Sequence, residues 1–176
     1  MNMGDIRVSE SHAMKCELAA EALRSSGILR LQVMGWSMLP TVWPGDTIIV
    51  ERVDSAEVPE GEIVLFRRDR RLFAHRVVKN QSDGLVTRGD SMRTPDSPVH
   101  ENEFLGRVSS IVRNGRRIEP RRTLRTGERA IASLVQRSEL AARVVVGDFE
   151  LKLRVGELRG GQSHFTNNCA LMGDVI

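Results

Sequence analysis

Aromatic residues and cysteines are scarce in this 176-residue chain. It contains no tyrosine, and aromatic residues make up only 4% of the sequence. Few side chains are available to stack on single-stranded bases, and no helix-turn-helix or zinc-finger pattern is present, so we expect no nucleic-acid partner. Cys16 and Cys169 lie near opposite ends, which supports neither a disulfide framework nor a Cys/His zinc site. We therefore expect no metal and no cofactor.

Long apolar stretches are missing as well. No run approaches the roughly 18 to 20 apolar residues that cross a bilayer as a helix, and the opening MNMGDIRVSESH lacks the zones of a secretory signal. We therefore expect no transmembrane segment and a cytoplasmic location. The net charge is +3, and the arginines occur in clusters, for which solvated loops are the simplest interpretation.

A helix followed by short strands is the pattern along most of the chain. Apolar residues recur at helical spacing from Ser11 to Ser26, and Gly27 is placed to end that helix. The members of this stripe are Met14, Leu18, Ala19, Ala22 and Leu23. Strand-like runs follow, at Leu29 to Val33, Thr47 to Arg52, Glu62 to Arg67, Leu72 to Val78, Leu85 to Arg88 and Gly106 to Val112. We therefore expect a mainly β fold with a short N-terminal helix.

The region after these strands contains a turn and a second helical stripe. Asn114-Gly115 predicts a two-residue hairpin, because both central positions of a type I′ turn need positive φ. A C-terminal helix after Thr126 is indicated by the apolar residues Ile131, Leu134, Val135 and Ala142, and Val144 to Val146 either extend it or begin a strand. Basic residues beside this stripe leave two alternatives open, peripheral contact with an anionic membrane or packing against the domain. The expected organisation is a helical segment (1–27), a β-rich domain (28–120), a helical extension (121–150) and a flexible tail (151–176).

Ser37 lies in a turn between two predicted strands. The segment GWSMLPT follows the run that ends at Val33, and Pro40 prevents that strand from continuing. A serine hydroxyl is a poor nucleophile until a base removes its proton. Ser37 is therefore a candidate nucleophile only if a partner lies beside it, and is otherwise a polar loop residue.

His75 is the candidate base. It alone among the four histidines lies in a strongly predicted strand. Histidine supplies a neutral base near neutral pH, whereas a lysine base requires strong desolvation. Lys79 shares the expected strand face, but at about 3.3 Å per residue it lies about 13 Å further along. Only one of the two can serve Ser37.

Two carboxylates follow on one loop. The segment TRGDSMRTPD carries Asp90 and Asp96 directly after a predicted strand. A carboxylate that binds the far nitrogen of an imidazole fixes its tautomer and stabilises the imidazolium. Taken alone, both aspartates are more simply turn residues that bind backbone amides.

Five blocks of sequence occur in an order that resembles signal peptidase I. They are GWSMLPTVWPGDTIIV, GEIVLFRRD, FAHRVV, TRGDSMRTPDSPV and LGRV, between Gly35 and about Val112. The resemblance implies the β-fold catalytic domain that signal peptidases share with self-cleaving SOS repressors. Bacterial members place a lysine where this chain has His75, so the site is similar to the archaeal and endoplasmic-reticulum branch.

That resemblance implies roles for particular residues. Ser37 is the implied nucleophile, His75 the base and Asp96 the relay acid, with Asp90 six residues earlier in support. The backbone N–H of Ser37 is the implied oxyanion donor, and Gly35 replaces a serine that adds a second donor in some members. We expect the substrate pocket to involve the strands near Met38, Val42 and Ile63.

The sequence thus predicts a serine endopeptidase that cleaves an extended peptide or protein through an acyl-enzyme. A repressor-like peptidase that cuts its own chain is the alternative, although only 36 residues precede Ser37 and they contain no DNA-binding pattern. A peptide-binding module without catalysis is a third possibility, which the intact set Ser37, His75 and Asp96 disfavours. The missing anchor disfavours cleavage of secretory preproteins.

Overall fold

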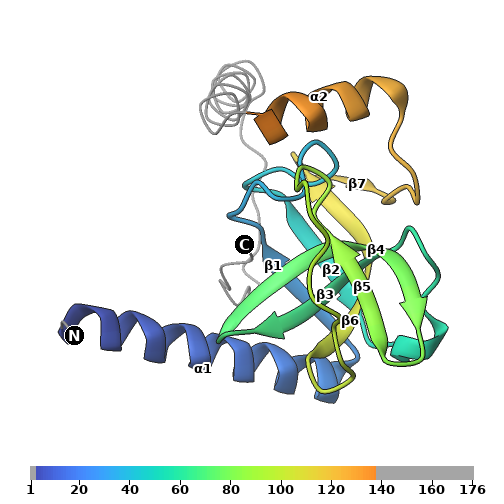
Figure 1. Cartoon of the computed structure of the whole chain (residues 1–176). Coiled ribbons are helices and arrows are strands. Elements are labelled where there is room, and N and C mark those ends of the chain that lie inside the picture. The colour runs from blue at the N-terminus through green and yellow to red at the C-terminus, as the bar shows by residue number, and fades with distance from the viewer. Residues whose placement is uncertain (1–2, 138–176) are drawn as a thin grey trace.

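The computed structural model of the chain describes residues 3–137, and its side chains from residue 13 to residue 136. One curved sheet lies between two helices (Figure 1). The elements are α1 (Met3–Ser26), β1 (Ile28–Gln32), β2 (Thr47–Glu51), the 3-10 turn η1 (Ser55–Glu57), β3 (Ile63–Arg68), β4 (Arg71–Gln81), β5 (Gly84–Arg88), β6 (Phe104–Arg113), β7 (Arg116–Ile118) and α2 (Thr126–Arg137). The expected mainly β fold with a helix at each end is confirmed.

The sheet has seven strands and each of its pairings is antiparallel. Its order is β1-β2-β6-β3-β4-β5, with β7 paired to β6. β6 therefore joins the N-terminal hairpin of β1 and β2 to the meander of β3, β4 and β5. This pairing brings the loop that leaves β1 and the loop that leaves β5 to the same side of β4, between the sheet and α2 (Figure 1).

The N-terminal helix is longer than predicted, since it begins at Met3 and not at Ser11. It ends at Ser26, and Gly27 follows with φ +72°, as the sequence predicts for a helix terminator. The predicted apolar stripe is partly wrong, because Met14 and Leu18 are exposed. The buried face consists of Cys16, Ala19, Ala20 and Leu23, at i, i+3, i+4 and i+7. Small residues on this face let the helix lie close to the sheet.

Two clusters of buried side chains cover the two faces of β3 and β4. The larger cluster includes Ile63, Leu65, Leu72 and Ala74 and packs against α1. The smaller cluster includes Val64, Phe66 and Val77 on the opposite face. Alternate residues of a strand point to opposite faces, so these strands are buried on both sides. β4, which carries His75, is thereby a rigid support.

The C-terminal part of the described chain agrees with the predicted order of elements. Asn114 and Gly115 both have positive φ, 51° and 72°, and join β6 to β7. The predicted stripe of α2 is partly wrong, because Ile131 and Leu134 are exposed and Val135 is buried. Ala142, Val144 to Val146 and the tail 151–176 lie outside the described residues, and the domain boundaries stay a prediction.

Among the described residues, neither α1 nor α2 combines the length and apolar content needed to cross a bilayer. Within residues 3–137, moreover, no group of three or more His, Cys, Asp or Glu side chains is arranged to hold a metal ion.

A bidentate ion pair between Arg68 and Glu103 fixes the segment that follows Asp96 to the sheet. Arg68 of β3 donates from Nε and Nη2 to the two carboxylate oxygens of Glu103, both at 2.7 Å. The same guanidinium donates to the carbonyl oxygens of Ser97 and Pro98, at 3.1 and 2.9 Å. The hydrogen bond from Arg68 holds the pKa of the Glu103 carboxyl below its ordinary value.

Replacing Glu103 with glutamine is predicted to remove a pH-dependent part of the stability. The folded-state pKa of Glu103 lies below its ordinary value of 4.5. The pair therefore contributes stability that is fully present above that value and is lost as pH falls through the folded-state pKa. We expect Glu103→Gln to lower the free energy of unfolding by about 1 kcal/mol near neutral pH, and by progressively less in acid, in urea titrations.

Glu21→Gln is the matched control, because Glu21 pairs with Arg24 on the surface of α1, where both side chains are mostly exposed. Exposed pairs contribute little, so this variant should unfold like the wild type at each pH. If the difference in free energy of unfolding between Glu103→Gln and the wild type stays constant from neutral pH into acid, the account of the ion pair is contradicted.

Candidate active site

Ser37 lies in a loop whose base and middle are both fixed. The loop from β1 to β2 is closed at its base, where Val33 donates to the carbonyl oxygen of Asp46 at 2.8 Å and accepts from Gly45 at 2.7 Å. The buried carboxylate of Asp46 accepts from the Trp43 amide at 2.8 Å and from Nη2 of Arg113 at 2.6 Å. Ser37 itself begins a turn and is half-buried. The loop thus holds the hydroxyl in one position.

His75 of β4 brings its ring to this hydroxyl. Nε2 of His75 lies 3.0 Å from Oγ of Ser37, although 38 positions separate them in the chain. The ring is buried against the stacked pair of Phe66 and Phe73, whose centroids lie 5.8 and 6.0 Å from its own. These aromatic contacts limit rotation of the imidazole and keep water from the side of the ring that they cover.

Asp96 binds the other nitrogen of the same ring. Its Oδ2 lies 2.7 Å from Nδ1 of His75 and also accepts from Oγ1 of the buried Thr87 at 2.7 Å. The backbone closes the same contact, because the Asp96 amide donates to the Thr87 carbonyl at 2.8 Å. A carboxylate at Nδ1 favours the tautomer that carries its proton there, which leaves Nε2 free to accept from Ser37.

The surroundings of Asp96 keep its carboxyl ionised. Burial acts to raise the pKa of Asp96, but the hydrogen bonds from His75 and Thr87 and the nearby charge of Arg68 more than offset it. The result is a pKa below the ordinary value. An anionic group therefore lies next to the imidazole at neutral pH and stabilises it when it gains a proton.

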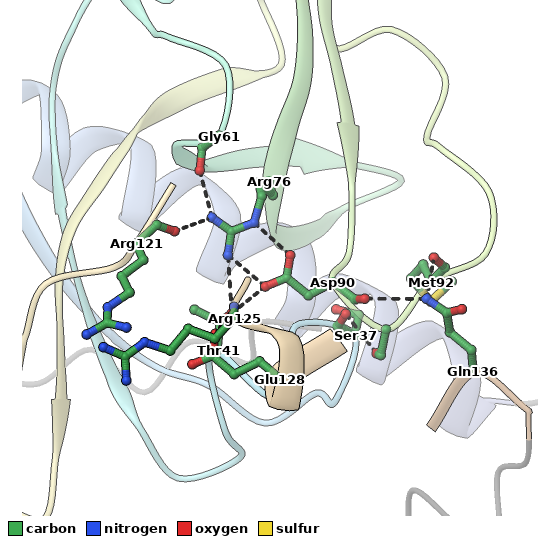
Figure 2. A network of polar contacts seen from close by, with 11 residues as sticks. Ser37, Thr41, Gly61, Arg76, Asp90, Met92, Arg121, Arg125, Glu128 and Gln136 are labelled. Atoms are coloured by element: carbon green, nitrogen blue, oxygen red, sulfur yellow. Dashed lines mark hydrogen bonds and ion pairs between the residues drawn. The ribbon is translucent and has the colours of Figure 1, made fainter. Parts of the chain in front are cut away.

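Asp90 has a different partner. Arg76, the neighbour of His75 in β4, donates from Nε to Oδ1 and from Nη2 to Oδ2 of Asp90, both at 2.7 Å. Oδ2 also accepts from Thr41. Nη1 of Arg76 donates to the carbonyl oxygens of Gly61 and Arg121, at 2.7 and 2.6 Å (Figure 2). The structure thus pairs Asp90 with Arg76, and Asp96 with His75.

The segment after β5 lies directly against Ser37. The amide and hydroxyl of Ser91 both donate to the carbonyl oxygen of Ser37, at 3.0 and 2.9 Å. A Cβ atom added at Gly89 would lie 2.6 Å from that same oxygen and 3.2 Å from Nε2 of His75. Only glycine fits between the serine backbone and the imidazole.

The three residues predicted to form the substrate pocket are in the core. Met38, Val42 and Ile63 are 3%, 0% and 0% exposed and belong to the larger hydrophobic cluster. Apolar residues beside a nucleophile pack inward as readily as they contact a substrate, and here the three side chains pack inward. Their role in binding a substrate stays a prediction.

Lys79 is not placed as the sequence predicts. The expectation that it shares the face of His75 assumed regular alternation along the strand. The pairing of β4 with β5 shifts register between Val77 and Lys79, which breaks that alternation, and Lys79 is exposed. His75 is the basic side chain that contacts Ser37.

Several contacts of the site were missed by sequence reasoning. Thr87, Ser91 and Arg76 all lie within the five sequence blocks that resemble signal peptidase I. The sequence therefore indicates their positions but not their partners. Gln136 donates to the carbonyl oxygens of Asp90 and Met92, at 3.5 and 3.3 Å, from a helix outside those blocks. No local pattern marks such long-range partners.

A family model described as Peptidase S24-like matches residues 2–109, and comparison with curated proteins found no match. Because the family match covers more than half of the chain, the protein belongs to the Peptidase S24-like family. It is thus a member of a serine peptidase family with a mainly β fold. The match contains Ser37, His75, Asp90 and Asp96 and ends before β7 and α2.

Substituting Gly89 is predicted to disturb the site through the backbone of Ser37. The new Cβ meets a carbonyl oxygen that cannot move without shifting Ser37, so we expect Gly89→Ala to lower the free energy of unfolding by about 1 to 3 kcal/mol. Gly127→Ala in α2 is the control, because its Cβ meets nothing within 4 Å. Thermal unfolding of both variants tests this, and equal stabilities would contradict the close approach.

Proposed function

We propose that this protein is a serine endopeptidase in which Ser37 is the nucleophile, His75 the general base and Asp96 the orienting acid. The observation that carries the proposal is a chain of two hydrogen bonds. One joins Oδ2 of Asp96 to Nδ1 of His75 at 2.7 Å, and the other joins Nε2 of His75 to Oγ of Ser37 at 3.0 Å. The distance of 3.0 Å is in the range expected between a base and the nucleophile whose proton it takes, and the distance of 2.7 Å is that of a hydrogen bond that orients the base.

The proposed reaction follows from these two hydrogen bonds. Oγ of Ser37 attacks the peptide carbonyl carbon while its proton passes to Nε2 of His75, and Asp96 stabilises the imidazolium that forms. The backbone N–H of Ser37 donates to the oxyanion of the tetrahedral intermediate. Collapse of the intermediate breaks the C–N bond, and Nε2 gives its proton to the leaving amine. Water, activated by the same nitrogen, then hydrolyses the ester.

The substrate is an extended peptide or protein segment, as in signal peptidase I of the Ser/His branch. That branch is supported by a histidine in contact with the serine at the position before Arg76. Because Met38 is buried, the side chains that contact the substrate are the exposed ones next to the nucleophile. Trp36 and Met92 are 44% and 42% exposed and flank Ser37 and Gly89, so they favour an apolar group beside the scissile bond.

Cleavage of the chain by itself is a second candidate function. The family match supports it, because repressor-like self-cleavage is an activity of S24-like peptidase domains. Intact mass measurement of the full chain separates the two candidates. A pair of fragments that forms at a rate independent of protein concentration favours self-cleavage, whereas a stable full-length mass favours a separate substrate.

Loss of the nucleophile is predicted to abolish covalent labelling. A fluorophosphonate probe forms a stable ester with an activated serine, so Ser37→Ala should give no adduct. His75→Ala should lower the second-order labelling rate by at least about 10³-fold, because the hydroxyl is then no better than that of an ordinary serine. The measurement is the time course of adduct mass in each full-length variant.

Ser82→Ala is the control, since Ser82 is an exposed serine in the turn between β4 and β5. It should label at the wild-type rate. If Ser37→Ala is labelled as fast as the wild type, Ser37 is not the nucleophile and the proposed function is rejected.

A further inference from the structure

Helix α2 lies outside the family match, yet it packs on the loop that carries Ser37. The match ends at residue 109, and α2 spans Thr126–Arg137. Val135 is 7% exposed and clusters with Leu39, which is fully buried two residues after Ser37, and with Trp43 of the same loop. Ala132, one turn earlier, is also buried. The helix thus covers the turn that begins at the nucleophile.

The same helix holds the second loop of the site. Nε2 of Gln136 donates to the carbonyl oxygens of Asp90 and Met92, at 3.5 and 3.3 Å (Figure 2). In return, Nε of Arg93 donates to the carbonyl oxygen of Gln136 at 3.0 Å. These three contacts join the end of α2 to both sides of Ser91.

Ser91 links these contacts to the nucleophile. Its amide donates to the Ser37 carbonyl at 3.0 Å, and its hydroxyl donates to the carbonyl oxygens of Trp36 and Ser37, both at 2.9 Å. Moving the loop from Gly89 to Met92 therefore moves the backbone of Ser37. A helix that binds this loop on one side and Leu39 on the other fixes the nucleophile relative to His75.

We propose that α2 is a positioning element of the peptidase site, acting through Gln136 on the loop around Ser91 and through Val135 on the turn after Ser37. The proposal rests on the proposed function for its catalytic consequence. Gln136 is a positioning residue, since its contacts are with the loop and not with reacting atoms. A displacement of about 1 Å in a reacting group can cost up to about 10²-fold in rate.

The test compares one charge change on two sides of one helix. Gln136→Glu replaces the amide donor with a carboxylate that faces two carbonyl oxygens. Leu134→Glu introduces the same residue at a position that is 53% exposed. Arg93→Ala removes the reciprocal contact and leaves each buried side chain in place, so it remains informative if Gln136→Glu does not fold.

Two readouts separate this proposal from the proposed function. The first is the fluorophosphonate labelling rate of Ser37, which should fall about tenfold in Gln136→Glu and Arg93→Ala and stay unchanged in Leu134→Glu. The second is hydrogen exchange of the Ser91 amide, which should speed up by a similar factor, while the Val99 amide, bonded to Leu85 at 2.8 Å, should not change.

Each outcome has one meaning. Faster exchange at Ser91 together with slower labelling supports the positioning role. Unchanged exchange at Ser91 in Gln136→Glu and Arg93→Ala overturns it, whatever the labelling rate, and so does faster exchange at Ser91 with labelling at the wild-type rate. If the wild type is not labelled, the proposed function fails, and the exchange measurement still decides whether α2 fixes this loop.

Discussion

The hydrogen bond between Asp96 and Nδ1 of His75 is the interaction on which the rest of the site depends. It sets the tautomer of the imidazole and so decides which nitrogen is free to accept from Ser37. Its carboxylate remains ionised because Thr87 and His75 donate to it, against the effect of burial. The fold supports this bond from both ends, through two phenylalanines packed against the ring and through the backbone hydrogen bond between Asp96 and Thr87.

Neighbouring residues of one strand organise two loops. Because successive side chains in a strand point to opposite faces, His75 reaches Ser37 and Asp96 while Arg76 reaches Asp90. The Arg76 network also includes carbonyl oxygens before β3 and after β7, so four segments of the chain meet at one guanidinium. Such a fixed arrangement reduces the motion of the nucleophile relative to its base. The reaction requires this because the reacting groups must be closely aligned.

Sequence alone predicted the strands and the line of polar groups, and failed where side chains choose between core and surface. The strands carry regular apolar patterns bounded by turn residues, and the blocks that contain Ser37, His75 and Asp96 have an order that resembles one family. Which side chains are buried was harder to predict. Met14 and Leu18 look like core residues but face solvent, whereas Met38 looks like a pocket residue but lies in the core. The contact of Gln136 with the loop after β5 depends on tertiary packing across more than 40 positions, which periodicity does not encode.

The most direct test of this account is the fluorophosphonate labelling rate of Asp96→Asn. An asparagine keeps the size of the side chain but no longer selects the tautomer with a proton on Nδ1, nor does it stabilise an imidazolium. We predict a rate about 10³- to 10⁴-fold below that of the wild type, in a protein that still folds. A rate equal to that of the wild type would show that His75 does not depend on Asp96, and it would contradict the central claim.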